Sequence, residues 1–161
     1  MRIGVDVLAL GELDRLNTRE WFRRHTYADE ELGYAATLSP SREREFLAGR
    51  FAAKEAVVKA LGTGFGGGIR PAQVCVARDD RSAPVVRLSG AAARHAQELG
   101  LAAITVSIAH KGACVVAVAL AEDRGGSAAA TGHQAEQIAT TAVRNITRLR
   151  TGMGNARNGN A

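Results

Sequence analysis

Hydrophobic and polar residues alternate at the start of the chain. Ile3, Val5 and Val7 occupy every second position, and Gly4 and Asp6 lie between them. This period of two is typical of a half-buried β-strand, whose successive side chains point to opposite faces. We therefore predict a strand that carries Asp6 on the face opposite Ile3.

The longest predicted helix lies between Ser39 and Gly62. Ser39 followed by Pro40 is typical of a helix N-cap and a first helical position, and Gly62 is well placed to end the helix. The apolar residues at helical spacing are Leu47, Phe51, Val58 and Leu61. We expect this stripe to pack on a sheet, with Phe51 pointing inward.

Two shorter helices are predicted before it. Asn17 followed three residues later by Glu20 indicates a helix start, and this helix is expected to reach about His25. A second short helix is expected to begin near Asp29.

Strand-like and helical runs alternate after the glycine-rich stretch at 62–68. They read in order as strand, strand, helix, strand and strand, at residues 72–78, 85–88, 91–99, 104–109 and 113–120. Turn-forming residues at 79–82 and 111–112 indicate two hairpins. This order predicts an α+β fold over residues 1–122, with a long helix packed on a mainly antiparallel sheet.

Residues 123–161 differ in composition from the rest of the chain. Gly, Ser and Ala dominate residues 124–131, and the chain closes with a run rich in Gly and Asn, so we predict a flexible basic tail. Its five arginines and two acidic residues account for +3 of the formal charge of +5. A short helix at 135–150 is compatible with the helical spacing of Ile138, Ala142, Ile146 and Leu149.

Composition limits the class of protein. The 161 residues are 46% apolar, which is enough for one ordinary core. Because the chain shows no N-terminal leader pattern and no long apolar run, we expect a cytoplasmic protein without a membrane segment. Cys75 and Cys114 stand in separate apolar runs, which argues against a disulfide framework or a zinc site. The net positive charge admits nucleic acid, an acidic protein or a phosphorylated ligand as partner.

Few residues indicate chemistry by themselves. Glu55 and Lys59 are neighbours on the predicted helix, but such pairs are most often solvated surface pairs. Asp6 is unusual inside an apolar strand and His110 ends another strand, yet each is compatible with a structural role. The run at 62–68 contains the GxGxxG spacing of dinucleotide-binding loops, but it closes a helix instead of following a strand.

One segment is far more specific. Residues 45–64, with the sequence EFLAGRFAAKEAVVKALGTG, resemble the signature helix of holo-acyl-carrier-protein synthases, the short trimeric type of the 4′-phosphopantetheinyl transferase superfamily. Residues 4–7 resemble the opening strand of that family, residues 83–84 its hairpin and residues 107–110 its penultimate strand. The resemblance covers residues 1–122 in order.

The resemblance implies a reaction and its site. Asp6 and Glu55 are expected to bind Mg²⁺, together with waters and the pyrophosphate of coenzyme A. Glu55, as a general base acting through a water, and Lys59, which would neutralise pyrophosphate oxygens, are the expected catalytic residues. The residues expected to bind coenzyme A are Arg50, Lys59, Gly62, Pro84 and His110. A serine hydroxyl of an apo acyl carrier protein would attack the β-phosphorus, and 3′,5′-ADP would leave.

The same resemblance implies partners. An acidic acyl carrier protein of fatty-acid, polyketide or peptide synthesis is expected to dock on a basic surface. Arg15 matches a position of the family for this contact, and Arg19, Arg23 and Arg24 on the first predicted helix are expected to extend it, although a solvated helix face is equally compatible with each of these arginines. A homotrimer with active sites between neighbouring subunits is also expected. The chain departs from the family at Ala9, where an acidic residue usually continues the opening strand, so that Asp6 and Glu55 are left as the carboxylates.

The residues leave two other functions open. A catalytically weak module that binds coenzyme A or a carrier protein is compatible with the departure at Ala9. A nucleic-acid-binding protein is compatible with the arginines of the tail, although the chain has few aromatic residues and no recognition motif.

Overall fold

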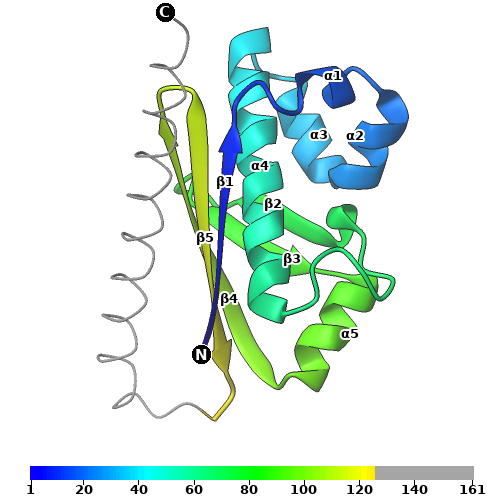
Figure 1. Cartoon of the computed structure of the whole chain (residues 1–161), viewed down its shortest axis with the longest axis vertical. Helices are drawn as coiled ribbons and strands as arrows, with labels where there is room; N and C mark the ends of the chain where they lie inside the picture. The colour runs from blue at the N-terminus through cyan, green and yellow to red at the C-terminus, as the bar shows by residue number, and fades with distance from the viewer. Residues whose placement is uncertain (126–161) are drawn as a thin grey trace, which may run out of the picture. The chain divides into compact units, whose positions relative to one another are not determined.

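A long helix lies across one face of a three-stranded antiparallel sheet in the computed structural model, which describes residues 1–125 (Figure 1). The sheet has the order β1-β5-β4, formed by β1 (Arg2–Ala9), β5 (Cys114–Asp123) and β4 (Leu101–Lys111). The helix is α4 (Pro40–Leu61). Of the predicted tail at 123–161, only residues 123–125 are described. The predicted short helix at 135–150 lies outside the described residues.

A hairpin and shorter helices complete the fold. The second sheet pairs β2 (Val74–Arg78) with β3 (Pro84–Leu88). The 3₁₀ turn η1 (Pro71–Gln73) precedes this hairpin and α5 (Gly90–Glu98) follows it. The helices before α4 are α1 (Asp14–Asn17), α2 (Glu20–Thr26) and α3 (Asp29–Ala35). The predicted α+β fold with a mainly antiparallel sheet is confirmed. None of the helices within residues 1–125 has the length and apolarity needed to cross a membrane.

Local signals set both ends of α4, as predicted. Ser39 is extended, with φ −65° and ψ 155°, and Pro40 opens the helix. Gly62 has a φ of 82°, in the left-handed region that glycine adopts without steric cost. Its N–H donates to the carbonyl oxygen of Lys59 at 3.1 Å, which closes the last turn.

The core lies between α4 and the inner face of the sheet. Four residues of β5 alternate along the strand and are fully buried: Val115, Ala117, Ala119 and Ala121. They meet small residues of α4, including Ala52, Ala53 and Ala56, which let the helix lie close to the sheet. Phe51, which we expected to point inward, is half-buried. It packs against this core and against a second, smaller cluster of buried residues, Tyr27, Ala35 and Leu47.

Gly4 allows β1 to lie against α4. A Cβ atom at this position would be 1.9 Å from the carbonyl oxygen of Ala56 and 2.7 Å from the amide nitrogen of Ala60. Any side chain here would push the strand off the helix. Asp6 lies on the same face of the strand as Gly4, opposite Ile3 as predicted. This close contact therefore also holds Asp6 near α4.

The predicted helix start at Asn17 is wrong. Asn17 is the last residue of α1, and its N–H donates to the carbonyl oxygen of Leu13 at 2.8 Å. Its side-chain oxygen accepts a hydrogen bond from the Tyr27 hydroxyl at 3.1 Å, so it does not cap the next helix. Arg19 takes the N-cap position of α2 instead.

Candidate active site

Asp6, Glu55 and Lys59 come together where β1 crosses α4. The Lys59 ammonium donates to Asp6 Oδ1 at 2.8 Å and to the carbonyl oxygen of Val5 at 3.1 Å. Glu55 lies one helical turn before Lys59. Burial raises the pKa of Glu55, the negative charge of Asp6 raises it further, and Lys59 lowers it. The charges of Asp6 and Lys59 therefore both act on the Glu55 carboxylate.

The two carboxylates fit a magnesium site. Within residues 1–125, no cluster of three or more His, Cys, Asp or Glu side chains is placed to bind a metal ion. Mg²⁺ does not need one, because it is usually bound by one or two carboxylates together with waters and substrate phosphates. Asp6 and Glu55 supply those two carboxylates, so these residues are compatible with the ion that the resemblance implies.

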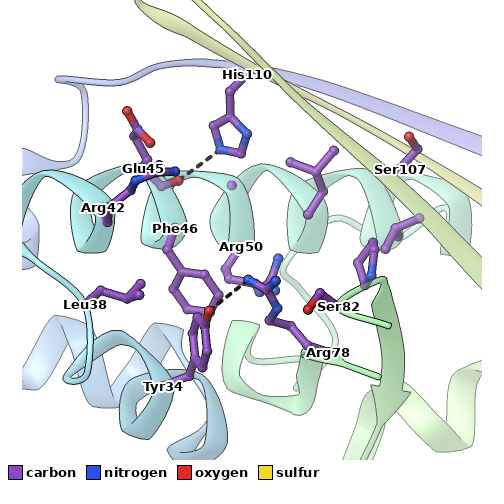
Figure 2. Close-up of a pocket in the computed structure, with 14 residues that line it drawn as sticks. Tyr34, Leu38, Arg42, Glu45, Phe46, Arg50, Arg78, Ser82, Ser107 and His110 are labelled. Atoms are coloured by element: carbon purple, nitrogen blue, oxygen red, sulfur yellow. Dashed lines mark hydrogen bonds between the residues drawn. The ribbon is translucent and has the colours of Figure 1, made fainter. Parts of the chain in front are cut away.

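A separate pocket of about 680 Å³ opens between α4, the β2-β3 hairpin and β4 (Figure 2). Arg50, Pro84 and His110, three of the five residues expected to bind coenzyme A, line it. Lys59 and Gly62 do not line it. The structure thus divides the predicted residues into two groups: those beside β1 and those in the pocket.

His110 lies against α4 because the helix has a glycine there. Its Nε2 is 3.2 Å from the carbonyl oxygen of Glu45. A Cβ atom on Gly49 would lie 3.1 Å from the same nitrogen and 3.4 Å from the side chain of Ile108. Gly49 therefore makes room for the imidazole, which faces the pocket together with Arg50.

Lys54 has a role that the sequence did not assign. It is fully buried, and its ammonium donates to Glu31 at 2.7 Å and to the carbonyl oxygens of Pro71 and Val74. Glu31 in turn accepts the N–H groups of Ala28 at 2.7 Å and of Val76 at 2.9 Å. This buried ion pair ties α3, α4 and β2 together. Helical spacing alone could not identify it, because the partners are 23 residues apart.

Tyr34 and Arg78 are pocket residues that the sequence analysis missed. The Arg78 guanidinium donates from Nη1 to the Tyr34 hydroxyl at 3.0 Å and lies 5.0 Å from the centre of its ring. Both residues line the pocket. No local sequence signal could pair them, since 44 residues separate them.

The four arginines expected to contact a carrier protein lie on or beside α1 and α2. Arg15, Arg19 and Arg24 are exposed, and Arg23 is half-buried. Arg23 pairs with Glu43 at 2.7 Å and Arg24 with Glu20 at 2.6 Å, so two of the four charges are already engaged within the chain. Trp21 lies between Arg19 and Arg23 in sequence. It is 64% exposed and is the most exposed large apolar side chain among the described residues.

Comparison with known proteins decides the family. The family model of the 4′-phosphopantetheinyl transferase superfamily matches residues 2–119. The chain belongs to this superfamily. The predicted family and the predicted enzyme class, a phosphopantetheinyl transferase, are therefore confirmed.

Curated relatives of this superfamily member are named holo-[acyl-carrier-protein] synthases. The protein from Desulfovibrio desulfuricans is 39% identical over 122 residues, which cover 74% of this chain and 95% of the relative. The protein from Alkalilimnicola ehrlichii is 41% identical over 109 residues, which cover 66% of this chain and 84% of the relative.

Solved structures of phosphopantetheinyl transferases share the fold. The Neisseria meningitidis holo-[acyl-carrier-protein] synthase superposes with a TM-score of 0.69 at 29% identity, covering 76% of this chain and 98% of the other. The Bacillus anthracis holo-(acyl-carrier-protein) synthase, solved in complex with CoA (3′,5′-ADP), superposes with a TM-score of 0.64 at 32% identity and covers 76% and 96%.

Proposed function

We propose that this enzyme, in the cytoplasm, transfers the 4′-phosphopantetheine arm of coenzyme A to a serine of an apo acyl carrier protein, in a Mg²⁺-dependent reaction that releases 3′,5′-ADP. The observation that carries the proposal is the meeting of Asp6, Glu55 and Lys59 at the crossing of β1 and α4. Two carboxylates and an ammonium within one cluster can hold a metal ion and a pyrophosphate side by side.

Each residue of the cluster has a part in this reaction. Asp6 and Glu55 would hold Mg²⁺, which when bound neutralises charge on the pyrophosphate. Lys59, 47% exposed, can turn its ammonium from Asp6 to the phosphate oxygens. Glu55 can receive the proton of the serine hydroxyl through a water. Phosphoryl transfer needs little beyond this positioning and charge neutralisation.

The expected carrier contact completes the substrate side. Arg15 and Arg19 are exposed and make no salt bridge within residues 1–125, so both are available to an acidic helix. Their predicted role rests on charge complementarity, which chiefly speeds association and orients the partner.

The direct test is an intact-mass measurement. An apo acyl carrier protein incubated with this enzyme, coenzyme A and Mg²⁺ should gain one phosphopantetheine arm, about 340 Da, and 3′,5′-ADP should accumulate in equal amount. Chelation of the metal should abolish the gain. If the enzyme binds coenzyme A but no carrier protein gains mass, the function is instead that of a binding module. Activity that survives complete chelation would remove Asp6 and Glu55 from the proposed metal site.

We also propose that the enzyme is a homotrimer whose active sites combine residues of neighbouring subunits. The outer face of the sheet is one support. Ile3, Val5 and Val7 pair there with Leu120, Val118 and Val116 of β5. The long helix α4 packs on the opposite, inner face of this sheet and does not cover the outer face (Figure 1). A second copy of the chain is the occupant we propose for this apolar face.

The division of the site is the second support. The residues expected to bind coenzyme A fall in two groups, and only one of these groups lines the pocket. A ligand that touches both would be held most simply by the Asp6 cluster of one subunit and the pocket of the next.

Oligomeric mass and complementation test the trimer together. Light scattering should give three times the chain mass of 16.9 kDa. Glu55→Gln and His110→Ala chains, each inactive alone, should recover transfer when they are mixed under conditions that exchange subunits, because a mixed trimer contains an intact site. A monomer of full activity, or a trimer whose mixtures stay inactive, would contradict shared sites.

A further inference from the structure

Two adjacent residues near the start of α4 are bonded to the short helices α1 and α2, which lie beside the first turns of α4 (Figure 1). Glu43 accepts a hydrogen bond from Arg23 of α2 at 2.7 Å. Arg44 donates to Asp14, the first residue of α1, from Nε at 2.7 Å and from Nη2 at 2.6 Å. The beginning of α4 therefore holds both helices that carry the arginines expected to contact a carrier protein.

The helix α1 is held by few contacts. It is only four residues long, and none of them is buried. A helix this short is not stable by itself in water. Leu13, just before it, is buried in the core, and Asn17 at its end accepts a hydrogen bond from the Tyr27 hydroxyl at 3.1 Å. Among the hydrogen bonds and ion pairs of residues 1–125, the pair of Asp14 and Arg44 is the one that ties the start of α1 to another helix.

The pair of Asp14 and Arg44 has a defined geometry. Two nitrogens of a planar guanidinium donate to the two oxygens of one carboxylate, which restrains both the distance and the orientation of α1 relative to α4. Gly11 leaves room for this arrangement, because a Cβ atom there would lie 3.2 Å from Arg44 Nη2. Both side chains are about half exposed, so the pair adds little to the stability of the fold. Its main effect is on the placement of α1.

We propose that Arg44 is a positioning residue for carrier-protein binding, which acts through Asp14 on Arg15. The inference rests on the proposed function, in which Arg15 and Arg19 contact an acidic helix of the carrier protein. Arg15 directly follows Asp14, and its exposed side chain makes no salt bridge within residues 1–125. A cation on an anchored helix meets an acidic group at a lower ordering cost than a cation on a mobile segment.

Steady-state kinetics of phosphopantetheine transfer by the full chain test this role. Arg44→Ala should raise the KM for the apo acyl carrier protein about five- to tenfold, the cost of ordering one or two freed side chains on binding. The kcat and the KM for coenzyme A should be unchanged, because Arg44 belongs neither to the Asp6 cluster nor to the pocket. The midpoint of thermal unfolding should change by no more than about 3 °C.

A second variant, Asp14→Asn, separates position from charge. It removes a negative charge beside Arg15, so charge complementarity alone predicts a lower KM for the acidic carrier protein. The positioning role predicts a KM about threefold higher, because the amide offers only one oxygen to the Arg44 guanidinium. The double variant Arg44→Ala/Asp14→Asn should be no worse than Arg44→Ala alone, since both changes break the same contact.

The matched control is Arg87→Ala. Arg87 also donates twice to one carboxylate, that of Glu30, at 2.9 and 3.0 Å, and it links β3 to α3 at similar exposure. Its loss should leave the KM for the carrier protein unchanged. An unchanged KM in Arg44→Ala, or a lowered KM in Asp14→Asn, would overturn the positioning role and leave the proposed function intact. A wild type that binds coenzyme A but modifies no carrier protein would overturn the proposed function, and this inference with it.

Discussion

Replacing Glu55 by glutamine should lower the rate of phosphopantetheine transfer by about two orders of magnitude or more, while the protein stays folded. Glutamine keeps the size of the side chain but removes its charge, so the proposed metal site keeps one carboxylate and the proposed base is lost. Removal of a single preorganised electrostatic group commonly costs 10² to 10³ in rate. The loss should appear in kcat, because it affects the charge that develops during transfer.

The stability of Glu55→Gln, unlike its transfer rate, should not fall below that of the wild type. The pKa of Glu55 is raised in the folded chain, first by burial and then by the charge of Asp6. A carboxyl group whose folded pKa lies above its unfolded value destabilises the fold at any pH where it is ionised. The neutral glutamine lacks this penalty above the unfolded pKa. At neutral pH the midpoint of thermal unfolding should therefore be equal to or above that of the wild type.

The transfer rate and the midpoint of thermal unfolding, measured on the same samples of Glu55→Gln, test both predictions. Glu98→Gln, at an exposed carboxylate near the end of α5, is the matched control and should change neither quantity. Near-normal transfer by Glu55→Gln would exclude Glu55 from the chemistry. A strongly lowered midpoint would mean that the loss of rate reflects damage to the fold.

Predictions from the sequence succeeded where the signal was local. The ends of α4 follow from Ser39, Pro40 and Gly62, whose backbone preferences act over one or two residues. The same holds for the hairpin turns. Asn17 shows the limit of this approach, since its side chain accepts a hydrogen bond from Tyr27, just after the end of α2, instead of capping the start of that helix. Tertiary contacts can override a local signal in this way.

The site could be predicted only in part. The resemblance supplied Asp6, Glu55 and Lys59, and the fold brings Asp6 to the other two although 53 positions of sequence separate it from Lys59. Arg78 and Tyr34 were missed because their pairing depends on how the β2-β3 hairpin packs beside α3. Lys54 stood in the recognised segment, but its partner Glu31 lies on a different helix. Each of the missed contacts joins elements that no periodicity connects.

Replacing Lys54 by methionine should destabilise the fold by about 3–5 kcal/mol, the range for breaking a buried ion pair by removing one partner. Both side chains of the pair are 0% exposed. Methionine fills nearly the same volume, but it leaves the Glu31 carboxylate buried without its countercharge. It also leaves the carbonyl oxygens of Pro71 and Val74 without their donor. The free energy of unfolding in urea, measured at one protein concentration, gives this difference.

A second substitution separates charge from packing. In the double variant Lys54→Met/Glu31→Gln the buried charge is gone, while the amide oxygen can still accept the N–H of Val76 or Ala28. Part of the lost stability should return, so the two changes should be far from additive. Lys111→Met, at an exposed lysine that ends β4, should cost less than about 0.5 kcal/mol. A double variant no more stable than Lys54→Met alone would show that the lost hydrogen bonds, and not the unpaired charge, hold α3, α4 and β2 in place.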